Sequence, residues 1–154
     1  MDRYDFMNEA IKLAEDASNA GEIPVGCVIV KDGKIIAEGK NRTEETKSSI
    51  MHAEVVAIEN ACKALSSPNL SGCEMYVTLE PCPMCAGAII NSKISKVVFG
   101  TFDLNYGACG SALNLFSIPK VHRPECYGGF SEDRCSDLLS EFFKNIRTNK
   151  NGEC

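Results

Sequence analysis

The sequence predicts one α/β domain in which helices cover both faces of a mixed β-sheet. Three patterns support this fold class: amphipathic helical stripes near both ends of the chain, an early β-hairpin, and short apolar strands alternating with helices between them. With 154 residues, 44% of them hydrophobic, the chain is long enough for one hydrophobic core. We therefore expect a three-layer α/β/α domain over residues 1–154, with a flexible tail over about 148–154.

The first half of the chain contains a helix, a hairpin and a second helix. Apolar residues recur at helical spacing over 6–17, and apolar runs over 25–30 and 35–37 flank the tight-turn sequence Asp32-Gly33. A polar, irregular segment over 39–51 then leads to a helix that begins near His52. This order predicts a hairpin whose strands are joined to the rest of the sheet through helices.

The second half repeats the alternation and ends in a helix. Strands are expected over 75–79 and 97–99, with a helix through 86–90 between them. A glycine-punctuated loop over 100–110 follows, then a short helix over 111–116 and a weakly indicated fifth strand near Tyr127. The final helix, from Cys135 to Ile146, has the clearest i, i+3, i+4, i+7 pattern in the chain.

Composition restricts the location and the partners of the protein. The first residues include acids where a signal peptide needs a basic segment, and no apolar run approaches the roughly 18–20 residues that span a bilayer. Nine cysteines, an odd number without an export signal, favour reduced thiols. We therefore expect a cytoplasmic protein with no membrane segment. The net charge of −5 does not indicate general nucleic-acid binding. Basic side chains nevertheless gather over 93–123 and 144–150. They could form a basic patch or could belong to an ordinary solvated surface.

Two short runs, His52–Glu54 and Pro81–Cys85, supply one imidazole, two thiols and one carboxylate. Zinc binds imidazole nitrogen and thiolate sulfur, and three protein ligands leave a fourth tetrahedral position for water. Zinc lowers the pKa of that water towards ~7, and a neighbouring carboxylate can transfer its protons. The sequence therefore predicts one catalytic zinc ion per chain, bound by His52, Cys82 and Cys85, with Glu54 as the proton-transfer group.

The surroundings of the cysteines favour this interpretation over simpler ones. A C-x-x-C pair alone is also typical of a redox pair or a structural zinc knuckle. Here Pro83 suits the first turn of a helix, which places Cys82 and Cys85 at a helix N-terminus that stabilises thiolates. His52 and Glu54 likewise fall in the first turn of their own helix, so two helix starts are expected to face one metal ion.

His52–Glu54 together with Thr78–Gly87 resembles the cytidine deaminase-like superfamily, whose zinc signature is H-x-E…P-C-x-x-C, and within it the bacterial tRNA-specific adenosine deaminases. The likeness extends from about Asp5 to Arg147. It implies a five-stranded mixed sheet with helices on both faces, and a homodimer whose active sites lie near the subunit interface. The implied reaction is hydrolytic deamination of the wobble adenosine in a tRNA anticodon loop to inosine.

The resemblance also assigns roles to individual residues. It implies zinc binding by the three ligands above, proton transfer by Glu54, and purine recognition by the Asn41 side chain and the Ala53 N–H. Asn41 by itself could equally shape a turn. Phe143 could be a core aromatic or an aromatic at the substrate edge. The remaining residues expected to contact the anticodon loop are Asp103, Asn105, Tyr106, His122 and Arg123.

Two other functions stay open at this point. One is a deaminase of a free base or nucleoside of the guanine, adenine or cytosine type; the other is a structural zinc module or an inactive binding subunit. Glu54 beside a three-ligand site argues against purely structural zinc. The chain departs from the family pattern at Ile50-Met51, Asn105-Tyr106 and Val121, all at the expected substrate rim. We hypothesise that Asn105 and Tyr106 alter loop recognition.

Overall fold

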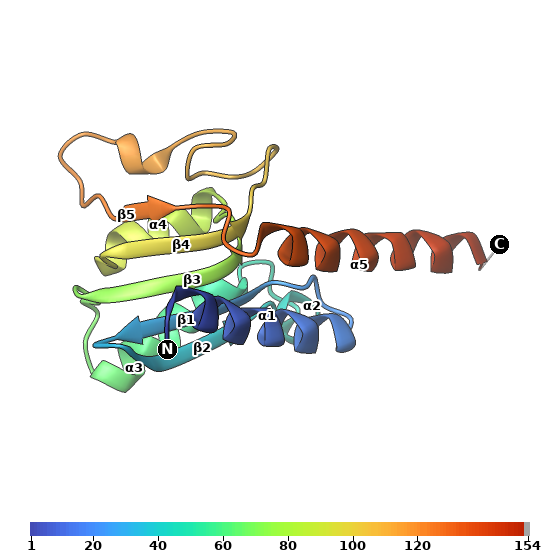
Figure 1. Ribbon diagram of the computed structural model, residues 1–154, viewed down its shortest axis with the longest axis horizontal. Coiled ribbons are helices and arrows are strands. Elements are labelled where there is room, and N and C mark those ends of the chain that lie inside the picture. Colours follow the sequence, from blue (N-terminus) through green and yellow to red (C-terminus); the bar gives the residue numbers. More distant parts are fainter. Residues whose placement is uncertain (153–154) are drawn as a thin grey trace.

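The computed structural model describes residues 1–152, with side chains described to residue 148. The sheet has five strands in the order β2-β1-β3-β4-β5 (Figure 1). The strands are β1 Gly26–Lys31, β2 Lys34–Lys40, β3 Cys73–Leu79, β4 Lys96–Thr101 and β5 Glu125–Tyr127. The helices are α1 Arg3–Asn19, α2 Thr43–Thr46, α3 Ala53–Leu65, α4 Pro83–Ser92, the 3₁₀ turn η1 Leu115–Ser117, and α5 Glu132–Gly152.

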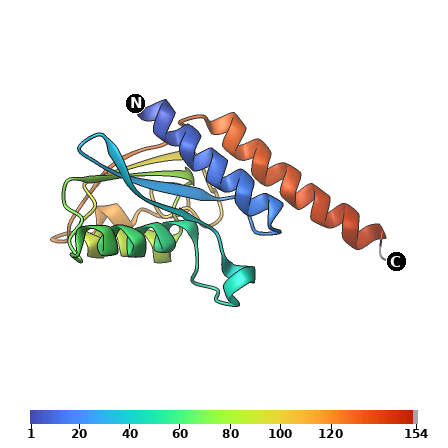
Figure 2. The same cartoon turned by 90° about the horizontal axis from the view of Figure 1, so that it is seen from below.

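The sheet is mixed, as predicted. β1 pairs antiparallel with β2 and β3, whereas β4 runs parallel to both β3 and β5. Figure 2 shows α1 and α5 side by side on one face of the sheet, with α3 and α4 on the other. The predicted three-layer α/β/α fold with a five-stranded mixed sheet is therefore confirmed.

Alternation along the central strands divides the core into two layers. Val28 and Tyr76 belong to the cluster formed with α1 and Cys135 of α5. Their neighbours Ile29 and Met75 belong to the larger cluster formed with α3 and α4. Because successive side chains of a strand point to opposite faces, β1 and β3 are buried on both sides, which explains their nearly continuous apolar sequences.

Gly39 in β2 brings the start of α3 unusually close to the sheet. A Cβ atom at this position would lie 2.3 Å from the Ala53 carbonyl oxygen and 2.6 Å from the Ala57 nitrogen. Only glycine allows this approach, because any side chain would meet the helix backbone. The strand therefore fixes the position of the first turn of α3, which carries the predicted metal ligand and proton-transfer group.

Several elements differ from the sequence prediction in detail. The expected irregular segment over 39–51 contains the short helix α2. The helix expected over 111–116 is only the 3₁₀ turn η1, since the preceding backbone bends back through bonds such as Ala112 N to Gly107 O. α5 continues to Gly152, and residues 153–154 lie outside the described part of the chain, so the flexible tail expected over about 148–154 stays a prediction.

Candidate active site

Three predicted ligands meet at the ends of two helices. The Nδ1 atom of His52 lies 3.6 Å from the sulfur of Cys82 and 3.6 Å from the sulfur of Cys85. Zinc bonds of about 2.3 Å to sulfur and 2.0–2.1 Å to nitrogen place tetrahedral ligands about 3.6 Å apart. The donor set and its spacing therefore fit one zinc ion, with a fourth position that no protein ligand fills among the described residues.

Local sequence explains why these residues converge. His52 and Cys82 occupy the N-cap positions of α3 and α4, both with extended backbone, and Pro83 begins α4. β3 runs almost directly into Cys82, so the sheet delivers this ligand without a long loop. The positive ends of two helix dipoles then face the site, which favours thiolates and other anions there.

The mutual contacts of the three ligand side chains shift their pKa values. A hydrogen bond from Cys85 and another from His52 lower the pKa of Cys82 to about 4. The same contact with Cys82 raises the pKa of Cys85 well above its usual range, and the pKa of His52 is also raised by its bond to Cys82. These contacts favour the thiolate form of Cys82, which is the form that binds zinc.

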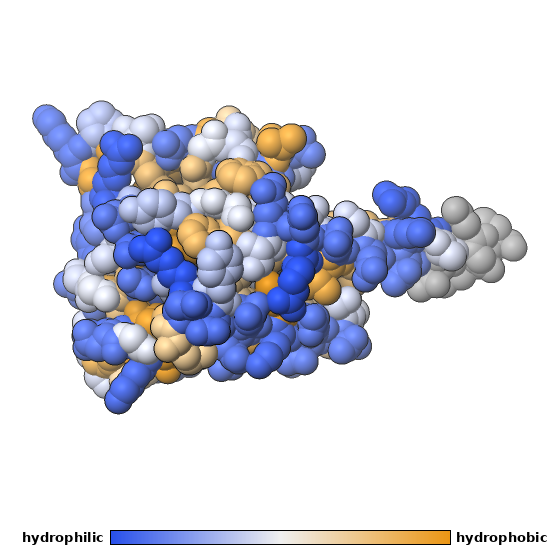
Figure 3. All heavy atoms as spheres, viewed as in Figure 1, coloured by the Kyte–Doolittle hydropathy of each residue, from blue (hydrophilic) through white to orange (hydrophobic). Residues whose placement is uncertain are grey.

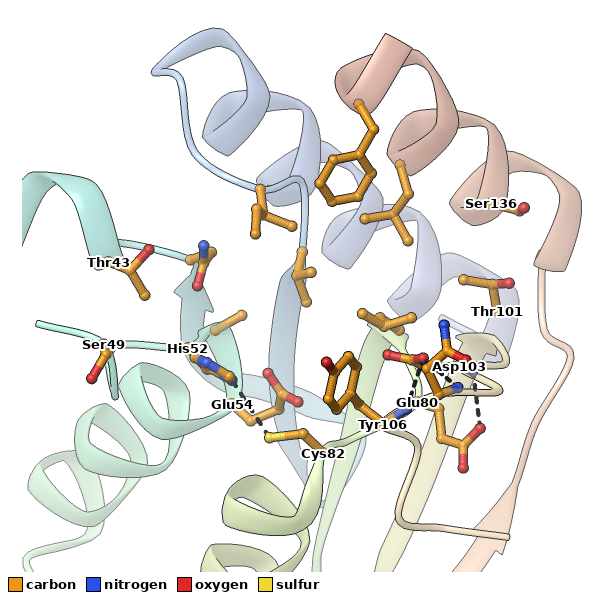
Figure 4. Close-up of a pocket in the computed structure, with 18 of the residues that line it drawn as sticks. Thr43, Ser49, His52, Glu54, Glu80, Cys82, Thr101, Asp103, Tyr106 and Ser136 are labelled. Carbon is orange, nitrogen blue, oxygen red and sulfur yellow. Dashed lines mark hydrogen bonds between the residues drawn. The ribbon is translucent and has the colours of Figure 1, made fainter. Parts of the chain in front are cut away.

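Glu54 lies beside the ligands but is not one of the clustered donors. Its side chain is 4% exposed, and burial raises the pKa of its carboxyl to about 7. Figure 4 shows Glu54, His52 and Cys82 directed into the same space. A carboxyl placed in this way can accept and return a proton near neutral pH, which is the role predicted for it.

A cavity of about 1070 Å³ opens over this group. Most of the predicted site residues line it, although they come from segments that are distant in the sequence. The lining includes Asn41, His52, Ala53, Glu54, Cys82, Asp103, Asn105, Tyr106 and Phe143. Phe143 is 43% exposed, so it stands at the cavity rather than within the core.

The two residues expected from the resemblance to bind the purine, Asn41 and Ala53, both line the cavity. Asn41 is 5% exposed at the cavity wall, and its backbone nitrogen bonds to the Val25 carbonyl. Ala53 is the first residue of α3, where a backbone N–H has no intrahelical acceptor. Contact of the Asn41 amide and the Ala53 N–H with a purine stays a prediction.

His122 and Arg123 are not brought to this cavity by the single chain. His122 Nε2 lies 2.6 Å from the Ile94 carbonyl oxygen, just before β4 and hence at the opposite end of the parallel strands. Arg123 lines a separate, smaller cavity of about 410 Å³. A contact between these residues and a substrate stays a prediction.

The structure adds residues that sequence reasoning did not single out. The buried carboxylates of Glu22 and Glu80 accept bonds from the backbone of α2 and of the loop after β4, respectively, at the cavity rim. α5 also contributes one face, with lining residues at helical spacing: Ser136, Leu139, Ser140 and Phe143. That spacing is visible in the sequence, but nothing local indicates which face of α5 meets the cavity.

A His-Cys-Cys zinc site with a buried carboxylate beside it, opening into a cavity on an α/β/α sandwich, defines a zinc-dependent hydrolytic deaminase. The family model for the cytidine and deoxycytidylate deaminase zinc-binding region matches residues 1–101. The chain belongs to this family.

Known proteins resemble the chain over most of its length. A tRNA-specific adenosine deaminase of Bacillus subtilis is 47% identical over 94% of this chain and 91% of that protein. A solved structure from a study of A-to-I editing by tRNA:A34 deaminases has a TM-score of 0.84, with 41% identity over 87% of this chain and 98% of that one. Guanine deaminase from Bacillus subtilis has a TM-score of 0.65, with 44% identity over 66% of each chain.

The described helices also bear on the membrane prediction. Within residues 1–152, no helix combines the length and the apolar character needed to cross a membrane.

Proposed function

We propose that this protein hydrolyses the wobble adenosine of a tRNA anticodon to inosine and releases ammonia. The observation that carries the proposal is that the likeness to tRNA-specific adenosine deaminases takes in 94% of the chain, and so reaches well beyond the zinc-binding region. The substrate-facing loops and α5 are thus part of the shared sequence, not only the metal ligands.

The residues around the metal divide the chemistry between them. His52, Cys82 and Cys85 would hold zinc, which when bound would supply a water nucleophile at neutral pH. Glu54 accepts a proton from the attacking water and delivers protons to ring nitrogen N1 and to the departing amine. Asn41 and the Ala53 N–H orient the purine so that C6 faces the metal. In the balanced reaction, water replaces the exocyclic amino group of adenine by oxygen.

Access to the site favours a base that is already unpaired. A nucleotide in a duplex must be unstacked before its base can enter such a cavity, whereas an anticodon loop is single-stranded. The exposed side chains of Leu104 and Tyr106 stand at the rim, where neighbouring nucleotides would pass. A single-stranded loop is therefore the kind of nucleic acid that this opening suits.

α5 offers the phosphate contacts that RNA binding needs. Phe143 lines the cavity, and the exposed Lys144 and Arg147 follow it along the helix. Figure 3 shows mostly hydrophilic side chains on the part of α5 that projects from the body. Cations in this position would contact the backbone of a bound loop and make its affinity depend on salt.

A second function, deamination of a free purine base, is favoured by one observation. The guanine deaminase of Bacillus subtilis is 44% identical to this chain where the two align. The alignment covers only 66% of this chain, compared with 87% for the tRNA:A34 deaminase structure. We therefore rank the tRNA substrate first and keep guanine as a comparison substrate.

The proposal includes a homodimer that acts in the cytoplasm together with its tRNA. Exposed apolar side chains outside the cavity, among them Met84 on α4 and Leu113, Ile118 and Val121 in the following loops, support a protein contact. The molar mass in solution, measured by light scattering after gel filtration, tests this assembly directly.

The activity test compares substrates on the zinc-loaded protein. An arginine-type anticodon stem-loop with a wobble adenosine is incubated beside free adenosine, guanine and cytidine. Inosine at the wobble position alone supports the proposal. Ammonia from a free base, with the stem-loop unchanged, would replace the tRNA substrate by a small molecule. No turnover with zinc bound would favour an inactive binding subunit.

A further inference from the structure

The carboxylate of Glu80 is buried beside the zinc site without a cationic partner. Its side chain is 2% exposed, and no salt bridge to it occurs among the described residues. Burial of an ionised group is unfavourable unless hydrogen bonds compensate for the missing water. All of the compensation at Glu80 comes from one segment of the chain, the loop that follows β4.

Four donors in this loop converge on the two carboxylate oxygens. Oε1 accepts from the Asp103 N–H at 3.1 Å and from the Ser111 hydroxyl. Oε2 accepts from the N–H groups of Cys109 and Ser111, each at 3.1 Å. The bonds therefore join both ends of the segment 103–111 to one point (Figure 4 shows the Asp103 side).

The middle of the loop also depends on this carboxylate. A Cβ atom at Gly107 would lie 2.5 Å from Oε2 of Glu80 and 2.4 Å from the Asp103 carbonyl oxygen. The loop is thus folded tightly around the carboxylate. Its outer turn is closed by Asp103 Oδ1, which accepts from the N–H groups of Asn105 and Tyr106, each at 3.1 Å.

We propose that Glu80 is a positioning residue that fixes the loop 103–111 and so sets where Asp103 and Tyr106 stand at the mouth of the zinc cavity. Both residues line the cavity, and Tyr106 is 70% exposed, so its own packing does not hold it in place. The fold supplies the anchor instead, because Glu80 directly follows β3 and its backbone N–H bonds to Thr101 at the end of β4.

Glu22 acts similarly on the other side of the cavity, which offers an internal comparison. Its buried carboxylate accepts from the N–H groups of Glu44 and Glu45 at 2.9 and 2.8 Å and so holds α2. Each rim segment therefore has its own buried carboxylate. Replacing one of them should loosen its own segment and leave the other unchanged.

Hydrogen exchange tests the positioning itself, whatever the substrate is. Glu80→Gln keeps the shape of the side chain but turns an NH₂ group toward backbone N–H donors, so at least one of the backbone bonds cannot form. We expect exchange over 103–111 to accelerate on the order of tenfold or more, with one zinc ion retained per chain. Glu22→Gln should accelerate exchange over 43–46 instead. Unchanged exchange over 103–111 in Glu80→Gln would overturn the proposal.

Kinetics test the consequence for substrate binding, which rests on the proposed function. In Glu80→Gln we expect KM for the anticodon stem-loop to rise on the order of tenfold, with a smaller change in kcat. The matched control is Glu74→Gln at the opposite end of β3, where the carboxylate accepts from the Tyr76 hydroxyl at 2.8 Å far from the cavity. It should leave both constants unchanged. A loss of kcat alone in Glu80→Gln would contradict a positioning role.

Failure of the proposed function and failure of the role proposed for Glu80 can be distinguished. If the wild-type protein does not act on the stem-loop, the proposed function fails, while the exchange result still decides whether Glu80 fixes the loop. If Glu80→Gln does not fold, Ser111→Ala removes one donor and leaves the carboxylate in place. That variant should show a smaller acceleration over 103–111, and an unchanged rate would count against the proposal.

Discussion

Gly39→Ala tests whether the sheet sets the geometry of the zinc site through backbone contact alone. The new Cβ would lie 2.3 Å from the Ala53 carbonyl oxygen, whereas ordinary van der Waals contact begins at 3.4 Å. The start of α3 must therefore move by about 1 Å. His52 and Glu54 move with it, while Cys82 and Cys85 on α4 stay in place. A misplacement of about 1 Å in catalytic groups can lower a rate on the order of 100-fold.

We therefore expect three measurable effects in Gly39→Ala. Overpacking should lower the free energy of unfolding by roughly 1–3 kcal/mol, measured by urea denaturation. Zinc affinity, measured by competition with a chromophoric chelator, should fall on the order of 10–100-fold, as when a ligand is no longer supported by its neighbours. The kcat of the zinc-saturated protein should fall on the order of 100-fold, because saturation restores the metal but not the position of Glu54.

Gly87→Ala is the matched control for this experiment. It lies in α4, which carries the cysteine ligands, and a Cβ there meets nothing within 4 Å. Alanine in a helix interior should stabilise the protein by roughly 0.5–1 kcal/mol without moving the site. If zinc-saturated Gly39→Ala keeps the wild-type kcat, the contact of α3 with β2 does not position the site. An equal loss of kcat in Gly39→Ala and Gly87→Ala would refute the reasoning as well.

Three other predictions concern the chemistry and the substrate. Glu54→Ala should retain zinc and lose turnover, measured by metal analysis beside inosine formation; turnover at the wild-type rate would exclude its role in proton transfer. Chelation should lower the melting temperature, and zinc affinity should fall with decreasing pH because protons compete for the His52 imidazole and the two thiolates; a melting temperature unaffected by chelation would contradict a zinc site that is part of the fold. Replacing both Lys144 and Arg147 by Gln should weaken stem-loop binding and reduce the slope of log affinity against log salt by roughly 0.7 for each phosphate that is no longer neutralised; an unchanged slope would place the RNA elsewhere.

The metal site could be predicted from the sequence because its geometry is mostly local. His52 and Glu54 share one helical turn, and Cys82 and Cys85 share another, so the backbone fixes each pair once the helices form. The Pro-Cys-Pro sequence also indicates where α4 begins. The one feature of the metal site that is not local is the approach of the two helices to each other. The alternation of strands and helices in the sequence predicts that approach as well.

The rim could not be predicted in the same way, because it depends on contacts between distant residues. Glu80 binds donors up to 31 positions away, and Glu22 holds α2 from 22 or 23 positions away. Glu80 lies within the Thr78–Gly87 run that carries the family resemblance, but nothing local in the sequence indicates which backbone donors either carboxylate binds. The sequence does not indicate the helix α2 for this reason: its four residues have no strong helical pattern, and the Glu22 carboxylate that accepts from the N–H groups of Glu44 and Glu45 is distant in the sequence.

The chemistry of deamination depends on local contacts, whereas the choice of substrate depends on contacts between distant residues. Deamination of a purine requires the metal, one proton-transfer group and a few polar contacts to the ring, and short sequence runs supply all of these. Selection between a free base and a base within RNA depends on what surrounds the cavity mouth. In this chain Asn105 and Tyr106, two residues at the cavity, sit on the loop that Glu80 folds. The bonds to Glu80 use mainly backbone donors, so they survive substitution of the outward-facing side chains of the loop. Such substitutions can therefore change which nucleotides enter the cavity without moving the metal ligands.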